Sequence, residues 1–186
     1  MAKVFDEITE HIRAWVFRQP MFFVGTAPLS GDGFVNVSPK GPIGSLKILD
    51  GHTVAFLDIS GSGAETIAHV RENGRIVLMF CAFQGPPRIV RLHGRGSVLR
   101  WDEPGFDDTG YESVTIPEAA RSIITVEVDR VSDSCGYGVP LMTFEGMRDH
   151  HRLSSTKKVR TMGEDGYATY KRTKNAESLD GLPAVS

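Results

Sequence analysis

The stretch 35–41, VNVSPKG, places polar side chains at every second position. If this stretch is a β-strand, Asn36, Ser38 and Lys40 project from one face of it. A lysine ammonium and a serine hydroxyl both offer hydrogen-bond donors, so this face suits an anion. A solvated polar strand face fits the same alternation, and the stretch alone does not separate the two interpretations.

A second candidate anion site is the loop of small residues at 60–63, SGSG, which leads into a predicted helix over 64–73. Ser62 and Glu65 have the spacing of a capping box, and Gly74 follows the helix as a stop signal. The first backbone N–H groups of a helix lack partners within it, so its N-terminus attracts anions, phosphate above all. The alternative is an ordinary capped connector helix.

Arg88 adds a second cation to this set, just beyond the two prolines at 86–87. One lysine, one arginine, several hydroxyls and a helix N-terminus together suit a phosphomonoester. We therefore expect a phosphorylated cofactor rather than a polymer as the ligand.

The rest of the sequence contains no motif that indicates a catalytic residue or a metal site. The sequence has no GxSxG, HExxH, Walker A or GxGxxG motif. His150 and His151 are adjacent, so a helix would direct them apart rather than onto one metal ion. Cys135 has no base close to it in sequence that would activate it as a nucleophile.

The composition is typical of a soluble globular protein. The formal net charge of −2 gives no basic excess for nucleic-acid binding, and no apolar run is long enough to span a membrane. Asp6, Glu7 and Glu10 stand where a signal peptide would be basic and then apolar. Cys81 and Cys135 are interpreted as reduced thiols, with Cys81 in the core. A cytoplasmic location is expected.

The elements that must position these residues are mainly strands. Apolar or alternating runs bounded by turn residues predict six strands, at 21–29, 34–39, 54–59, 76–80, 88–101 and 122–131. A helix is predicted over 5–18, and Gly94 and Gly96 indicate a bulge of the kind that barrels use to turn corners. This favours a mainly β fold with a few helices, an antiparallel barrel of about six strands. One domain over 1–171 is expected, followed by a flexible tail over 172–186.

The order of four segments resembles the pyridoxamine 5′-phosphate oxidase-like family of FMN-binding split β-barrels. The segments are VNVSPK, then IS with the loop and the ET that opens the helix, then RENGRIVLMF, then PPRIVRLHGRG, all within residues 20–100. The resemblance implies an antiparallel split β-barrel that forms a homodimer, with two FMN molecules in the cleft between the subunits.

The resemblance also assigns cofactor-binding roles by position. It implies that Asn36, Val37 and Ser38 lie along the flavin and that Lys40 is near it. The pair IS at 59–60 matches the end of the next strand of the family. The predicted cofactor-binding residues are Asn36, Val37, Ser38, Lys40, Ile59, Ser60, Ser62, Thr66 and Arg88.

Three positions depart from the family pattern. Thr66 stands where the authentic oxidases carry a phosphate-binding lysine, Glu65 where they carry an arginine, and Arg88 where they carry a flavin-contacting glutamine. Phosphate binding is therefore expected to rest on the helix N-terminus, on the Ser62 and Thr66 hydroxyls, on Arg88 and on the lysine at the end of VNVSPK.

The leading hypothesis is a cytoplasmic, homodimeric flavoprotein that binds FMN and transfers a hydride or electrons to or from an unidentified small molecule, with no nucleic acid and no membrane as partner. One alternative is a deazaflavin-dependent reductase on the same fold. Another is a non-enzymatic flavin carrier, redox sensor or haem-binding relative. Two questions stay open: whether GYGVP at 136–140 completes the site from the partner subunit, and whether the basic C-terminal segment closes over the cleft.

Overall fold

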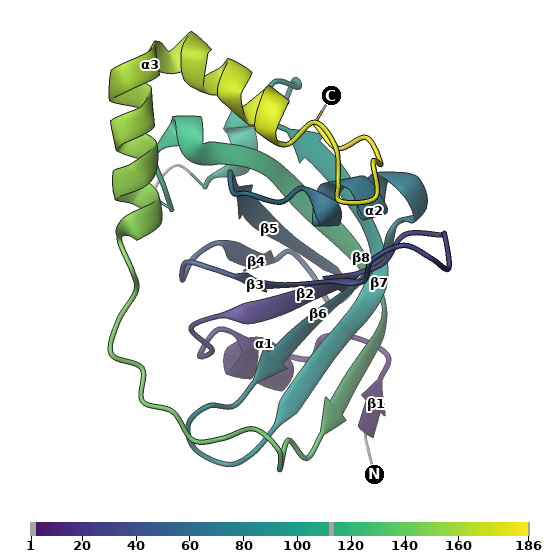
Figure 1. The fold of residues 1–186 in the computed structure, drawn as a ribbon. Helices are drawn as coiled ribbons and strands as arrows, with labels where there is room; N and C mark the ends of the chain where they lie inside the picture. The colour runs from purple at the N-terminus through teal and green to yellow at the C-terminus, as the bar shows by residue number, and fades with distance from the viewer. Residues whose placement is uncertain (1–2, 112–113, 186) are drawn as a thin grey trace.

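The computed structural model describes residues 3–111 and 114–185. Within these residues, eight strands form one antiparallel sheet in the order β3-β2-β6-β7-β8-β5-β4, with β1 paired to β8 (Figure 1). The strands are β1 (Lys3–Phe5), β2 (Phe22–Thr26), β3 (Asn36–Lys40), β4 (Leu46–Ile48), β5 (Thr53–Ile59), β6 (Arg75–Cys81), β7 (Ile89–Arg100) and β8 (Ala120–Ser134). The sheet curls into an open barrel, and β3 and β4 stand at the two ends of this strand order.

The two longest strands, β7 and β8, carry the curvature. Their pairing shifts register between His93 and Gly94, which is the bulge predicted from the glycines. The α-carbon of Gly94 lies so close to the backbone carbonyl of Glu127 that no β-carbon fits there. A residue without a side chain is therefore required where the sheet bends.

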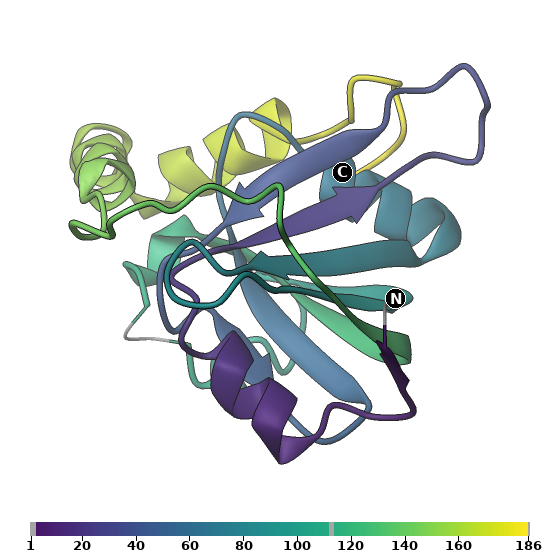
Figure 2. The same cartoon turned by 90° about the horizontal axis from the view of Figure 1, so that it is seen from below.

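The inside of the barrel holds the main hydrophobic core. Phe22 packs edge-on against Phe56 with ring centroids 5.5 Å apart, and it stacks on Phe80 at 5.4 Å. Helix α1 (Glu10–Val16) closes the lower end of the barrel in Figure 1, and α2 (Glu65–Asn73) lies at the upper end. Figure 2, seen from below, shows α1 beside the strands at this end of the barrel. Both helices bury apolar side chains in this core.

The outer face of β5 and β8 is also covered. Residues 101–111 and 114–119, which include the short helices η1 (Asp107–Thr109) and η2 (Pro117–Ala119), lie over it, and Tyr111 is buried against Leu57 and Ile123. β5 is therefore buried on both faces, which explains why its sequence reads as a continuous apolar run.

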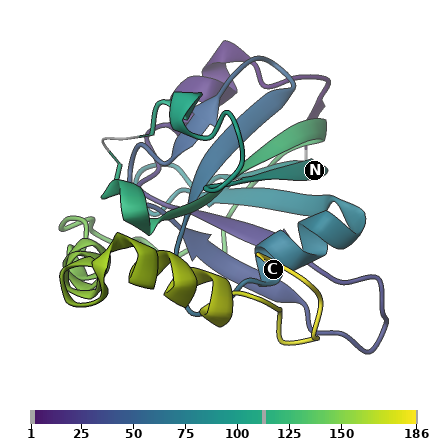
Figure 3. The ribbon, with the colours of Figure 1, turned by 90° about the horizontal axis from the view of Figure 1, so that it is seen from above.

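The C-terminal part of the chain crosses over the barrel. An extended stretch, 135–149, leads to helix α3 (His150–Lys174), which is interrupted at Gly163 (φ 74°). Residues 175–185 then turn back and lie beside α2, as Figures 1 and 3 show. None of the helices in the described residues is long and apolar enough to cross a membrane.

Residues 172–185 differ from the flexible tail that the sequence predicts. α3 continues to Lys174, and the last two described side chains, Ala184 and Val185, are buried in the main core at 0% and 2% exposure. The reason is local, because the pair AV follows a tight turn that returns it to the barrel. Ser186 lies outside the described residues.

The six predicted strands correspond to β2, β3, β5, β6, β7 and β8. The short strands β1 and β4 have too few residues to show a period. The helix predicted over 5–18 begins later, at Glu10, because Phe5 belongs to β1 and the Thr9 side chain accepts a hydrogen bond from the backbone N–H of Ile12 at 3.3 Å.

Candidate cofactor site

A pocket of about 340 Å³ opens where β3, β5 and the N-terminus of α2 meet. Ser38 and Lys40 of β3 line one side, and Ile59 with the loop 61–63 lines another. Thr66 of α2 lines the pocket as well. Five of the nine predicted cofactor-binding residues therefore lie around one pocket: Ser38, Lys40, Ile59, Ser62 and Thr66.

The wall of the pocket contains a buried carboxylate between two cations. Asp58 of β5 has no exposed surface, and its Oδ1 accepts a hydrogen bond from Lys40 Nζ at 2.7 Å. Its Oδ2 accepts bonds from Arg121 Nε at 2.8 Å and lies 2.7 Å from Arg121 Nη2. Burial alone would raise the pKa of Asp58, but the charges and hydrogen bonds of Arg121 and Lys40 outweigh it and lower that pKa to about 2.

The formal charge of the pocket is therefore balanced. Lys40 and Arg121 face the carboxylate of Asp58, and the pocket also contains the carboxylate of Glu65. A ligand meets no unpaired cation among these four residues. The hydroxyl residues Ser62 and Thr66 line the pocket, and the first backbone N–H groups of α2 have no partners within the helix.

A hydrogen-bonded network ties β3 to β2 and α2. Asn36 Nδ2 donates to Thr26 Oγ1 and to Thr66 Oγ1, both at 3.0 Å, and Ser38 Oγ donates to Asn36 Oδ1 at 2.8 Å. Asn36, Ser38 and Lys40 thus share one face of β3, as their spacing predicts. Val37 projects from the opposite face and is 65% exposed.

The start of α2 differs from the predicted capping box. The helix is capped at Ala64, no side chain forms a cap hydrogen bond there, and the Glu65 carboxylate reaches back beside Gly63. Ser62 lines the pocket but does not cap the helix. The predicted stop is confirmed, because Gly74 adopts φ 72° at the C-terminal end.

The loop at 60–63 is held from outside by its carbonyl groups. His151 Nε2 donates to Ser60 O at 2.7 Å, Asn175 Nδ2 donates to Gly61 O at 3.0 Å, and Arg121 Nη1 donates to Gly63 O at 2.7 Å. Two of these donors come from α3 and the segment after it. Ser60 itself is buried and does not line the pocket.

Sequence reasoning missed these supporting residues. Asp58 did leave a signal, since it is a lone acid inside the apolar run at 54–59 and a charge in such a run needs a partner. Nothing local marked Arg121, His151 or Asn175, which approach the loop from distant parts of the chain.

Arg88 lies outside this pocket. It lines a second, largely apolar hollow of about 660 Å³ near α1. Its Nη2 is 2.8 Å from Asp133 Oδ2, and its guanidinium lies over the Trp15 ring at 4.8 Å from the centroid. Gly136, the first residue of GYGVP, packs against the Arg88 backbone. Within one chain, neither Arg88 nor GYGVP joins the other predicted site residues.

Comparisons with known proteins identify the family. The model of the family described as "Pyridoxamine 5'-phosphate oxidase" matches residues 8–135. The chain belongs to the pyridoxamine 5′-phosphate oxidase family. A relative from Aspergillus flavus, "Pyridoxamine 5'-phosphate oxidase family protein ustO", is 39% identical over 194 residues, which span 97% of this chain and 77% of that protein. The family resemblance predicted from the four segments is confirmed.

Solved structures show the same fold. A crystal structure of a HupZ variant from Group A Streptococcus has a TM-score of 0.55 at 16% identity, covering 68% of this chain and 99% of that one. Another HupZ structure has a TM-score of 0.53 at 17% identity, covering 67% and 91%. At these identities the similarity concerns the split-barrel fold alone.

This member of the pyridoxamine 5′-phosphate oxidase family thus combines the family fold with a charge-balanced pocket. No group of three or more His, Cys, Asp or Glu side chains among residues 3–111 and 114–185 is arranged to hold a metal ion. Both cysteines are free, with Cys81 buried as predicted and Cys135 exposed.

Proposed function

We propose that this protein is a flavin-binding oxidoreductase that holds FMN with its phosphate in the pocket between β3, β5 and α2. The observation that carries the proposal is the convergence of Thr66 and the first backbone N–H groups of α2 on one pocket in a member of this family. These are neutral donors, and backbone N–H groups at a helix N-terminus are a common phosphate-binding arrangement.

The donor set fits a phosphate by hydrogen bonding rather than by net charge. Lys40 and Arg121 are already paired with Asp58, and the position of Glu65 opposes a second negative charge. Phosphate affinity therefore rests on Thr66 and the helix start. Because the basic pair that the resemblance assigns to 65 and 66 is absent, the proposal stops at flavin redox chemistry and does not extend to oxidation of pyridoxamine phosphate.

Strand β3 is suited to contact the ring system of the cofactor. It is an edge strand, so the backbone groups on its outer side are not paired with another strand of this sheet. The side chains of Asn36 and Val37 project from opposite faces of β3. A flavin ring that contacts both residues therefore lies along the backbone of this strand. The bound flavin supplies hydride or electron transfer, and this chain supplies binding and orientation.

We also propose that the protein is a homodimer that buries the exposed face of β3. Val35 is 73% exposed, Val37 65% and Ile43 57%, all on or beside this edge strand. Adjacent apolar side chains at a sheet edge are typical of a protein interface. A second subunit would also be needed to bring Arg88 or GYGVP to a cofactor beside β3. The cytoplasmic location stays part of the proposal.

Binding of three ligands tests the proposal. The purified protein is mixed with FMN, riboflavin or a deazaflavin, desalted, and its absorbance spectrum recorded. We expect retention of FMN, with Thr66→Val raising the Kd for FMN about tenfold, roughly 1.4 kcal/mol, while Thr66→Ser keeps most of the affinity. The Kd for riboflavin, which lacks the phosphate, should not change in either variant.

The other outcomes are equally specific. Retention of the deazaflavin instead of FMN would favour the deazaflavin-dependent alternative. Retained FMN that neither NADH nor NADPH reduces under anaerobic conditions, and that no substrate screen reduces, would favour a carrier or sensor. If none of the three ligands is retained, the proposed site is wrong.

A further inference from the structure

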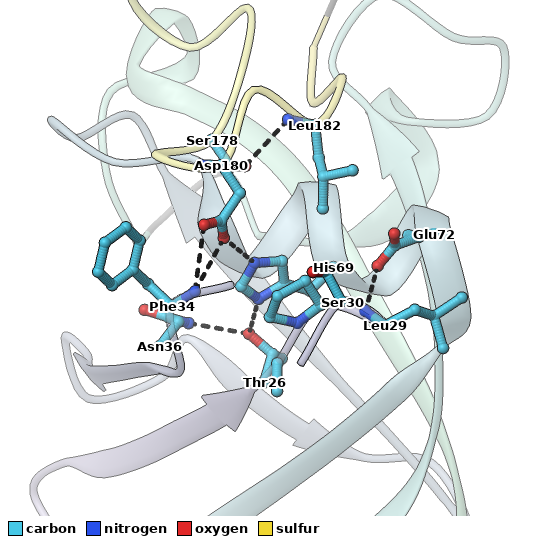
Figure 4. Close-up of polar contacts among 12 residues, drawn as sticks. Thr26, Leu29, Ser30, Phe34, Asn36, His69, Glu72, Ser178, Asp180 and Leu182 are labelled. Atoms are coloured by element: carbon cyan, nitrogen blue, oxygen red, sulfur yellow. Dashed lines mark hydrogen bonds and ion pairs between the residues drawn. The ribbon is translucent and has the colours of Figure 1, made fainter. Parts of the chain in front are cut away.

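His69 of α2 is completely buried and lies between the barrel and the C-terminal segment (Figure 4). Its Nδ1 is 3.0 Å from Thr26 Oγ1, a hydrogen-bond distance. Its Nε2 faces Asp180 Oδ2 at 3.6 Å and has no hydrogen-bond partner within the described residues. Burying a nitrogen without a hydrogen-bond partner costs free energy unless a suitable charge lies near it. The carboxylate of Asp180 is such a charge.

The same hydrogen-bonded network continues from His69 to the pocket. Thr26 Oγ1 also contacts Asn36 Nδ2, whose second N–H reaches Thr66 Oγ1, and Asn36 Oδ1 accepts from Ser38 Oγ. Thr66 and Ser38 line the pocket, whereas Asp180 lines a separate pocket together with Glu72, near the C-terminal end of α2. One continuous chain of polar contacts thus connects the C-terminal segment to the two pocket hydroxyls.

The proton on the imidazole determines the direction of every bond in this chain. A neutral imidazole carries one hydrogen, on Nε2 or on Nδ1. With the hydrogen on Nε2, Nδ1 accepts from the Thr26 hydroxyl. Thr26 then has no hydrogen left for Asn36, so Asn36 presents its NH₂ group to both threonines. The hydroxyl hydrogen of Thr66 remains free to point into the pocket.

With the hydrogen on Nδ1, each of these bonds is reversed. Nδ1 donates to Thr26, and Thr26 donates to Asn36, whose amide turns its oxygen toward both threonines. The Thr66 hydroxyl then donates its hydrogen to Asn36 and presents only lone pairs to the pocket. Ser38 accepts from the Asn36 NH₂ group, and its own hydrogen becomes the free one.

Asp180 distinguishes these two states. A carboxylate that faces Nε2 attracts an N–H there and repels a lone pair. The carboxylate is fixed in place, since it accepts a bond from the backbone N–H of Phe34 at 3.1 Å and 3.3 Å, and the Ser178 hydroxyl accepts bonds from the Asp180 and Leu182 N–H groups, both at 3.2 Å. Figure 4 shows Asp180 directed at both Phe34 and His69.

We propose that Asp180 is a positioning residue that holds His69 with its hydrogen on Nε2 and thereby makes Thr66 a hydrogen-bond donor toward the ligand. This inference rests on the proposed function for the identity of the ligand. The direction of the bonds does not depend on that identity. Asp180 therefore acts on the pocket without lining it.

Nitrogen-15 NMR of the imidazole tests the direction of the bonds without any ligand. We expect the chemical shifts of an imidazole that carries its hydrogen on Nε2. In Asp180→Asn the new amide keeps its oxygen on Phe34 and offers NH₂ to Nε2, so we expect the hydrogen on Nδ1. Glu177→Gln, the same change at an exposed acid of this segment, should leave the spectrum unchanged. A wild-type ring protonated at Nδ1 or at both nitrogens would overturn the proposal.

The affinity for FMN tests whether Asp180 makes the Thr66 hydroxyl a donor toward the ligand. In the wild-type background we expect Thr66→Val to raise the Kd for FMN about tenfold. In Asp180→Asn, Thr66→Val should have less than a twofold further effect, because the Thr66 hydrogen already points away from the ligand. Fully additive effects of the two substitutions would contradict the proposal. If FMN does not bind at all, the proposed function fails, and the NMR result still decides this inference.

Discussion

Asp58 has no exposed surface, and the two cations on its carboxylate come from β3 and β8, which are not neighbours in the sheet. Lys40 is the last residue of the edge strand β3, so its bond to Asp58 spans the open side of the barrel. A buried ion pair of this kind adds little over a well-packed apolar group, but losing one member leaves the others without a partner. The residue is therefore important to the closed shape of the pocket.

Asp58→Asn should destabilise the protein by about 3–5 kcal/mol at pH 7, because it leaves Lys40 and Arg121 as uncompensated charges. Urea unfolding of the purified protein measures the difference. Asp129→Asn is the matched control, since Asp129 lies on the same strand as Arg121 and is exposed. If both substitutions lower the free energy of unfolding equally, the buried contacts of Asp58 with Lys40 and Arg121 are not the cause.

The difference in stability between wild type and Asp58→Asn should depend on pH. The pKa of Asp58 is about 2 in the folded protein against an ordinary value of 3.8, so its contribution is complete above about pH 4 and is lost as the pH falls toward 2. The stability difference between wild type and Asp58→Asn should therefore narrow by roughly 2 kcal/mol below pH 4. A difference that is constant down to the acid unfolding transition would contradict the assigned pKa.

At the scale of elements, the C-terminal segment 175–185 joins three parts of the molecule. Its backbone pairs with itself, with Ala184 N donating to Ala176 O at 2.8 Å and Val185 N donating to Asn175 O at 3.1 Å. Arg71 of α2 donates to the Ala184 carbonyl, and Asn175 holds the pocket loop. The segment thus completes the core, covers α2 and supports the site.

Val185→Ala should lower the free energy of unfolding by roughly 2 kcal/mol, because it removes two buried methyl groups and leaves a cavity. Leu179→Ala removes more carbon from the same segment, but Leu179 is 76% exposed, so we expect almost no change. Chemical unfolding compares the two variants. If both leave stability unaltered, the segment does not contribute to the core in solution.

At the scale of the whole molecule, the open edge of the barrel is both the proposed cofactor face and the proposed dimer interface. Closed barrels have no free strand edges, whereas β3 exposes an edge and apolar side chains. A symmetric contact through β3 would cover them in both subunits at once.

Val37→Glu should convert the dimer to a monomer, because it places a charge in the centre of this apolar face. Light scattering coupled to size-exclusion chromatography measures the mass, and circular dichroism confirms that the strands are kept. Leu179→Glu, at an exposed position on the C-terminal segment, should leave the dimer intact. A wild-type protein that is monomeric at all concentrations would exclude the proposed interface.

The sequence by itself determined the six main strands, the bulge at Gly94, the α2 stop at Gly74 and the shared face of Asn36, Ser38 and Lys40. Each of these depends on residues within a few positions of one another, because strand periodicity and glycine conformations are local. The order of the family segments also predicted which strand and which helix meet at the pocket.

Only the tertiary structure decided how the pocket is charged and supported. Lys40 is paired with Asp58, Arg121 arrives from β8, and His69 meets Asp180 from 111 positions farther along the chain. Arg88, chosen for its charge, is held by Asp133 at another part of the molecule. These contacts join residues far apart in sequence, and their partners follow from how the barrel curls and where the C-terminal segment docks, neither of which has a local signal.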